Sequence, residues 1–397
     1  MTRLLRWWTA LLLCLILPAG TAQAAPTTAA ERFKVEPAPR GWAGAVAVLD
    51  WQTGELLYAR NAHQPRDPAS TTKVLTALLA LELGKMDDLV KVSRRAGRTP
   101  GSSMYIKEGE VYSLHDLLHG LLLRSGNDAA VAIAEHLSGS VEEFAKLMTR
   151  RARELGAKNS QFANPHGLTH PQHRSTAYDL AIITRTAMQH PTFREIVAKA
   201  AYPITYEQLG REQTLYNTNR LLGRLEGADG VKTGTTAAAG PCLIASATRD
   251  GQKVIAVVLH ASNRWREAGE LLEWAFRNFQ VTQLGQQGEV VRAVPVQRGK
   301  RLHVDVALKD DLSLVLPRKG GQVPEIHVDV ETKVTAPIQK GQPMGMATVA
   351  LSDGRDLRVP LVAAQAIPEA TWVDRIYRFL VSLLQTTDSI GINLLLP

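Results

Sequence analysis

The run Ser70-Thr71-Thr72-Lys73 contains the two side chains of this sequence whose types and spacing most directly suggest chemistry. A serine hydroxyl becomes a nucleophile only when a base removes its proton. Three residues apart on a helix, both side chains lie on one face, so the lysine can be that base. Its pKa must first fall, and partial burial or a second cation would lower it. Alone, the run also fits a helix cap, because Asp67-Pro68-Ala69-Ser70 is a typical helix start.

A second motif, Ser125-Gly126-Asn127, lies in a turn between two apolar segments. It can be ordinary turn chemistry, because serine and asparagine side chains hydrogen-bond to nearby backbone. In the catalytic interpretation, the Ser125 hydroxyl relays the proton from Lys73 to the leaving amine. Asn127 would then hydrogen-bond the backbone amide of the substrate.

A third motif, Lys232-Thr233-Gly234-Thr235, opens an apolar strand. A lysine at a strand start is commonly a solvated edge residue, but the Thr-Gly-Thr that follows favours anion binding. Lys232 is also the second cation that would lower the pKa of Lys73. Gly234 lets a peptide lie close to the strand edge and add by backbone pairing.

The three motifs together indicate an acyl-enzyme formed on Ser70, although each of them alone is common. The backbone N–H groups of Ser70 and Thr235 would form an oxyanion hole for the tetrahedral intermediate.

The helices and strands expected around these motifs must position them. Their order predicts an α+β domain, with helices packed on an antiparallel sheet whose strands come from both chain ends. We expect a hairpin around Gly54 and later strands at 243–248 and 253–259. We expect helices from Ser70, at 114–123, at 129–137, from the cap at Ser140 to Gly156, and at 264–279.

A second, all-β domain is predicted at 288–366, after a catalytic domain at 37–282, because short alternating runs replace the helical periodicity. The segment 368–386 then carries apolar residues at helical spacing between Trp372 and Leu384. It is too short and polar to span a bilayer. It can lie in a membrane interface as an anchor, or it can pack on its own domain.

Residues 1–24 have the pattern of a secretory signal peptide, with Arg3 and Arg6 before an apolar run and a small-residue cleavage site. An uncleaved N-terminal anchor is the alternative. Cleavage would leave Cys242 as the only cysteine, in an apolar run that indicates a buried thiol. The net charge of +8 is spread along the chain. For an exported protein this argues against a nucleic-acid partner and fits an anionic membrane or wall polymer.

With these motifs, the chain resembles the serine D-Ala-D-Ala carboxypeptidases, the low-molecular-mass penicillin-binding proteins. The likeness runs from about Pro37 to the C-terminal helix and includes 67–69, 117–130 and 162–168. It implies that Ser70 is acylated, Lys73 is its base and Ser125 the relay. It implies substrate binding by Asn127, Lys232, Thr233, Gly234 and Thr235. Arg266 would hold the terminal carboxylate, although a surface arginine at a helix start would look the same.

The resemblance also implies a substrate, a cellular role and a class of inhibitor. Such an enzyme removes the terminal D-alanine from peptidoglycan stem peptides that end in D-Ala-D-Ala, and so acts in peptidoglycan maturation and cell shape. β-Lactam antibiotics would acylate the same serine, and no cofactor or metal is implied. The architecture implied is a β-lactamase/transpeptidase-like domain, a small β domain and an amphipathic helix on the outer face of the cytoplasmic membrane.

Several alternatives stay open. A class A β-lactamase shares the three motifs, but no Glu-x-x-Leu-Asn segment lies between the second and third, and Gly126 stands where that class has aspartate. Endopeptidase or transpeptidase activity would use the same acyl-enzyme. A non-catalytic wall-binding protein would be expected to have a broken motif. His166, His170 and His173 cluster in sequence but lack metal-site spacing.

Overall fold

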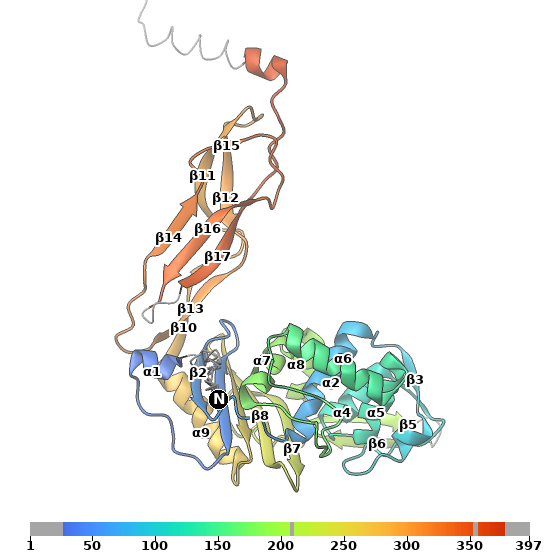
Figure 1. Ribbon diagram of the computed structural model, residues 1–397. Helices are drawn as coiled ribbons and strands as arrows, with labels where there is room; N and C mark the ends of the chain where they lie inside the picture. Colours follow the sequence, from blue (N-terminus) through green and yellow to red (C-terminus); the bar gives the residue numbers. More distant parts are fainter. Residues whose placement is uncertain (1–26, 207–209, 352–355, 378–397) are drawn as a thin grey trace, which may run out of the picture.

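The computed structural model describes residues 27–206, 210–351 and 356–377. An α+β unit (residues 29–278) is followed by an elongated β unit (residues 279–363) that extends away from it (Figure 1). The described C-terminal residues lie at the far end of the β unit. The predicted signal peptide lies outside the described residues.

The α+β unit is built on an antiparallel five-stranded sheet with the order β2-β1-β9-β8-β7. Its strands are β1 (Ala45–Asp50), β2 (Leu56–Arg60), β7 (Ala228–Thr236), β8 (Gly240–Arg249) and β9 (Gln252–Leu259). The hairpin around Gly54 and the pairing of early with late strands confirm the predicted arrangement.

Both faces of this sheet are covered. Alternate residues of the central strands enter two separate cores, so that Val257 of β9 packs on one face and Val258 on the other. Helix α9 (Arg264–Asn278) covers the second face. The first face carries α2 (Lys73–Leu83), α4 (Leu114–Leu122), α5 (Asn127–Ser138), α6 (Val141–Glu154), α7 (Ala177–Ala187) and α8 (Pro191–Ala198). Because it is buried on both faces, β9 has no exposed residue.

Short elements complete the α+β unit. Helix α1 (Ala29–Phe33) packs beside β2, in the core that α9 shares. The edge of the helical layer carries α3 (Arg94–Gly97), the paired strands β3 (Leu89–Lys91) and β4 (Val111–Ser113), and the hairpin of β5 (Ala201–Tyr206) and β6 (Arg211–Tyr216). The sequence did not predict the last hairpin.

The β unit confirms the predicted all-β character. Its six-stranded sheet has the order β14-β16-β17-β12-β11-β15. The strands are β11 (Val290–Gln297), β12 (His303–Leu308), β14 (Ile326–Val330), β15 (Val334–Thr335), β16 (Pro343–Ala350) and β17 (Asp356–Ala363). A separate pair, β10 (Phe279–Gly285) with β13 (Leu312–Pro317), joins the two units.

Candidate active site

Ser70 lies in a 3-10 turn, η1 (Ala69–Thr72), directly before α2. Lys73 is fully buried, and its Nζ lies 2.9 Å from Ser70 Oγ. No side chain caps η1 or α2. The helix-cap interpretation of Ser70 is therefore wrong, and the hydroxyl faces the lysine instead.

Two further oxygens hold the Lys73 amine. Nζ donates to Asn127 Oδ1 at 2.7 Å and to the His166 carbonyl oxygen at 2.7 Å. The His166 carbonyl comes from a loop, residues 164–168, that Asn164 folds. Asn164 Oδ1 accepts from Gly167 N at 2.7 Å, and its Nδ2 donates to Leu168 O at 2.9 Å. Lys73 is therefore fixed by three parts of the chain far apart in sequence.

Gly167 explains how this loop comes so close to the serine. Its φ is +88°, and a Cβ at this position would overlap the Ala69 carbonyl. Only glycine tolerates both the backbone conformation and the contact.

The second motif lies at the turn between α4 and α5. Ser125 is buried and has a φ of 64°, an uncommon conformation for a residue other than glycine. Its side chain has no hydrogen-bond partner among the described residues. Asn127 is also buried, and its Nδ2 donates to the Pro100 carbonyl at 2.6 Å. The structure thus gives both ends of the Asn127 amide a protein partner, Lys73 for Oδ1 and Pro100 for Nδ2.

The third motif lies on β7, the last strand of the sheet, whose outer edge faces η1. A Cβ on Gly234 would lie 2.8 Å from Ser70 N and 3.0 Å from Ala69 Cβ. Gly234 is therefore needed for contact between the strand and the serine turn, which differs from the predicted approach of substrate. Lys232 Nζ donates to the Thr233 carbonyl at 3.0 Å, and the Thr233 hydroxyl lies 2.7 Å from that of Thr218.

The structure does not bring Arg266 to this site. Its side chain is 74% exposed and its Nε donates to Glu270 at 2.7 Å. Arg264, two residues earlier, contacts the third motif instead, because its Nη1 donates to Gly234 O and to Thr235 Oγ1, both at 2.8 Å. The predicted role of Arg266 does not fit its position, and Arg264 is the arginine of the Arg-Trp-Arg run that contacts a predicted site residue. The pair Arg266/Glu270, four residues apart, is a sequence sign of an exposed helix face that would have separated the two.

Burial and neighbouring cations make both lysines of the site weak bases. Burial is the main cause that holds the pKa of Lys73 well below its usual value, and the charge of Lys232 lowers it further, against Asp128. Burial lowers the pKa of Lys232 to about 7, with help from Arg264. A neutral Lys73 amine within reach of Ser70 Oγ is what general-base activation requires.

The comparisons with known proteins agree with this geometry. Residues 32–263 match the family described as D-alanyl-D-alanine carboxypeptidase (peptidase S11), and residues 279–369 match the C-terminal domain of penicillin-binding protein 5. The chain belongs to the D-alanyl-D-alanine carboxypeptidase family. The activity of that family, which acts on peptidoglycan, is therefore the activity of this chain.

Individual relatives cover most of the chain. D-alanyl-D-alanine carboxypeptidase DacF of Bacillus subtilis is 38% identical over 338 residues, 81% of this chain and 85% of that protein. D-alanyl-D-alanine carboxypeptidase DacD of Escherichia coli is 33% identical over 368 residues, 88% of this chain and 93% of that protein. The crystal structure of penicillin-binding protein 5 from Haemophilus influenzae superposes with a TM-score of 0.71 at 30% identity, over 84% of this chain and 100% of that one.

Membership of this carboxypeptidase family decides against a class A β-lactamase and against a non-catalytic scaffold. Three groups that contact the motif residues were not predicted from the sequence. They are Arg264, the Thr218 hydroxyl and the His166 carbonyl. Thr218 and His166 lie in loops, and only the fold brings them to the motifs.

The remaining candidates from the sequence are the histidine cluster and Cys242. In the described part of the chain, no group of three or more His, Cys, Asp or Glu side chains could hold a metal ion. His173 is buried between Thr72 Oγ1 and Ala163 N, whereas the His170 ring accepts from Gln172 N. Cys242 is buried, and burial raises its thiol pKa to about 11, as suits a packed thiol.

Proposed function

We propose that Ser70 is the nucleophile of this carboxypeptidase and Lys73 its base. Lys73 Nζ takes the hydroxyl proton while Ser70 Oγ bonds to the carbonyl carbon of the penultimate D-alanine. The proton then passes by way of Ser125 to the amine of the terminal D-alanine, and the C–N bond breaks. Water hydrolyses the ester and returns the proton to Ser70. The observation that carries this proposal is the buried Lys73 amine 2.9 Å from Ser70 Oγ.

The oxyanion and the terminal carboxylate have separate places in this proposal. The backbone N–H groups of Ser70 and Thr235 receive the oxyanion. Arg264 and the hydroxyls of Thr233 and Thr235 receive the carboxylate of the leaving D-alanine. The support for Arg264 is its hydrogen bond to Thr235 Oγ1. Hydrolysis of a D-Ala-D-Ala peptide should fall about tenfold or more in Arg264→Gln, the cost of one charge-assisted bond, and stay unchanged in Arg266→Gln.

Intact-mass spectrometry after benzylpenicillin tests the nucleophile. We expect a mass increase of one drug molecule, mapped to the Ser70 peptide and absent in Ser70→Ala, together with release of D-alanine from a D-Ala-D-Ala peptide. A folded protein that neither gains the adduct nor hydrolyses the drug would contradict the acyl-enzyme.

We further propose that the protein is exported and that its C-terminal helix contacts the outer face of the membrane. Residues 372–377 are helical, and Trp372, Val373, Ile376 and Tyr377 are each more than half exposed. Of the segment predicted as a helix, 368–371 are not helical, and 378–386 lie outside the described residues. None of the described helices is long and apolar enough to cross a bilayer. A short helix with exposed aromatic and aliphatic side chains suits a position in the interface.

A further inference from the structure

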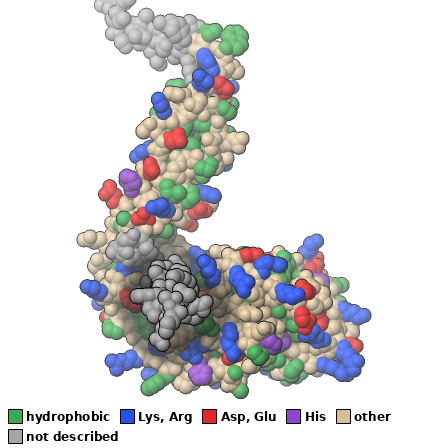
Figure 2. Space-filling model, viewed as in Figure 1, with side chains coloured by type: hydrophobic (Ala, Val, Ile, Leu, Met, Phe, Trp, Pro, Cys, Tyr) green, Lys and Arg blue, Asp and Glu red, His purple; other side chains and the backbone are tan. Residues whose placement is uncertain are grey.

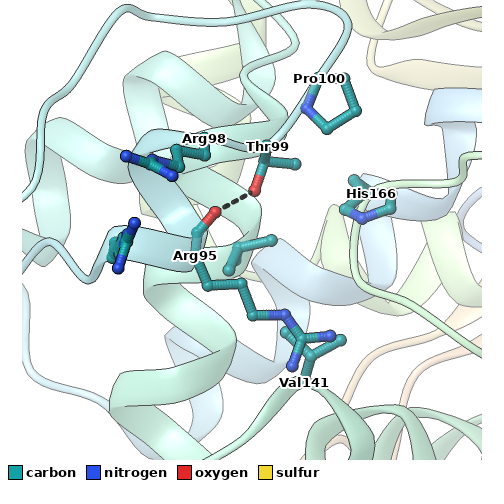
Figure 3. Close-up of a pocket in the computed structure, with 8 residues that line it drawn as sticks. Arg95, Arg98, Thr99, Pro100, Val141 and His166 are labelled. Carbon is teal, nitrogen blue, oxygen red and sulfur yellow. Dashed lines mark hydrogen bonds between the residues drawn. The ribbon is translucent and has the colours of Figure 1, made fainter.

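A basic cavity is lined by His166, whose carbonyl oxygen accepts from Lys73 Nζ. It has a volume of about 620 Å³ and is lined by Arg94, Arg95, Arg98, Thr99, Pro100, Val131, Val141 and His166. Figure 3 shows His166 and Pro100 on one side of this cavity and Arg95 and Arg98 across from them. None of the three sequence motifs contributes a residue to it.

The cavity carries uncompensated positive charge. Arg95 is neutralised by Glu142, with two hydrogen bonds of 2.8 and 3.1 Å. Arg94 and Arg98 are exposed, and within the described part of the chain no carboxylate lies within ion-pair distance of either. Their exposure shows that the cavity opens to solvent. Two guanidinium groups without a partner, at the rim of a concave site, are the arrangement that binds a carboxylate.

His166 adds a neutral donor to the cavity wall. Its Nδ1 accepts from Leu168 N at 3.2 Å, which leaves the ring proton on Nε2. Burial, Lys73, His173 and Arg95 lower the pKa of this ring to about 3, so it is uncharged at neutral pH. Arg95 of the cavity therefore lowers the pKa of His166, the residue whose carbonyl oxygen also accepts from Lys73 Nζ.

Two walls of the cavity contact the catalytic groups directly. The His166 carbonyl accepts from Lys73 Nζ at 2.7 Å, and the Pro100 carbonyl accepts from Asn127 Nδ2 at 2.6 Å. Arg264, the group proposed to bind the leaving D-alanine, contacts Gly234 and Thr235 of β7 and does not line the cavity. With its scissile carbonyl at Ser70 and its leaving group toward Arg264, a peptide would extend its acyl side past Asn127, whose partner Pro100 lines the cavity.

We propose that Arg94 and Arg98 select stem peptides that carry a free carboxylate on the acyl side of the D-Ala-D-Ala bond. This proposal rests on the proposed function and adds a specificity site to it. An amidated stem peptide, which offers no negative charge there, would be bound less well.

The test uses the full chain and two synthetic peptides that end in D-Ala-D-Ala and differ in one group. The first has a γ-linked D-glutamate with a free α-carboxylate before its third residue, and the second has the carboxamide. We expect wild type to prefer the acidic peptide by about tenfold in kcat/KM, mainly through KM, as two partly exposed charge contacts provide. The double variant Arg94→Gln/Arg98→Gln should lose this preference. Raising the salt to 1 M, where the Debye length is about 3 Å, should weaken it in wild type.

Arg150→Gln/Arg153→Gln is the matched control, because it removes the same charge from α6 at a different cavity. It should keep the wild-type preference. Equal preference in wild type and in Arg94→Gln/Arg98→Gln, or no preference in wild type, would overturn the proposal while leaving the proposed function intact. Acylation by benzylpenicillin and hydrolysis of the amidated peptide should persist in all variants. Their absence in wild type would overturn the proposed function itself, and this proposal with it.

Discussion

At the scale of single residues, the proposed chemistry depends on two buried lysines, Lys73 and Lys232. Within the described chain, neither Lys73 nor Lys232 has a carboxylate as a hydrogen-bond partner, and both are almost without solvent contact. Burial disfavours their charged forms, and each further cation adds to that effect. The pKa of Lys73, the proposed base, is therefore lowered by Lys232, a lysine of another motif.

The first prediction concerns the effect of Lys232 on Lys73. Lys73 acts as a base only when neutral, so acylation rises with pH through its pKa. Removing the second cation in Lys232→Gln should raise that pKa and move the acid limb of the pH profile for benzylpenicillin acylation to higher pH. Below the limb, each unit of displacement lowers the rate about tenfold. Lys232→Arg keeps the charge and should leave the limb in place. Superimposable wild-type and Lys232→Gln profiles would exclude this coupling.

A second prediction concerns the contact between β7 and the serine turn. In Gly234→Ala the new methyl group would press on Ser70 N and Ala69. We expect acylation to fall about a hundredfold or more, because a displacement of 1 Å at the reacting atoms has that effect. Gly269→Ala is the control, because nothing lies within 4 Å of its Cβ and alanine favours the interior of helix α9. It should acylate normally and melt at the same or a higher temperature.

At the scale of elements, the loop 164–168 and the adjoining segment 98–101 form one support for Lys73 and Asn127. A Cβ on Gly101 would meet Asn127 Nδ2 at 2.7 Å and Leu168 Cδ2 at 3.9 Å, so these segments pack on each other beside the serine. The sheet places the Lys-Thr-Gly strand, α2 places the lysine, and these loops fix the distance between them.

Loosening the loop 164–168 should reduce the acylation rate by more than the loss of folding stability alone explains. Asn164→Ala removes the hydrogen bonds that fold it, so the His166 carbonyl would no longer hold Lys73. We expect a loss of about 1–3 kcal/mol of stability and at least a tenfold fall in acylation rate well below the melting temperature. The control is Ser140→Ala, which removes the N-cap of α6. It should cost about 1 kcal/mol and leave acylation unchanged. Equal acylation rates in the two variants would contradict a positioning role.

At the scale of the whole molecule, the β unit packs against the α+β unit at its base and carries the C-terminal helix away from it (Figure 1). Phe279 and Val315, from β10 and β13, belong to the same core as α9. Arg318 Nε donates to the Phe276 carbonyl at 2.6 Å. On the face of the α+β unit seen in Figure 2, Lys and Arg side chains are spread out and lie among acidic ones. In the proposed attachment, the far end of the β unit contacts the membrane.

Attachment through this end predicts a loss of membrane binding when its apolar side chains are changed. Trp372→Ser/Ile376→Ser should lower sedimentation with anionic lipid vesicles by about tenfold or more, since burial of these side chains is worth several kcal/mol. Release of D-alanine from a soluble peptide should stay at the wild-type rate. The control is Val290→Ser/Val323→Ser, a change of two exposed apolar residues elsewhere on the β unit. Undiminished sedimentation of the first variant would argue against the helix as the anchor.

The sequence by itself determined what depends on local pattern. The spacing of Ser70 and Lys73 implied a shared face, and the structure places their atoms 2.9 Å apart. Alternation and helical periodicity predicted β8, β9, α5 and α9 within a few residues of their observed bounds. These features are readable because a helix or a strand repeats its side-chain directions over a few residues.

Only the tertiary structure decided what depends on contacts between distant segments. It selected Arg264 over Arg266, because the rotation of α9 relative to β7 sets which side chain reaches Thr235. It brought the His166 carbonyl to Lys73 and placed Gly234 against Ser70 N. It also formed the cavity of Arg94 and Arg98, from segments that show no common pattern in the sequence. Such contacts form between loops and surfaces without periodicity, so the sequence shows no local signal for them.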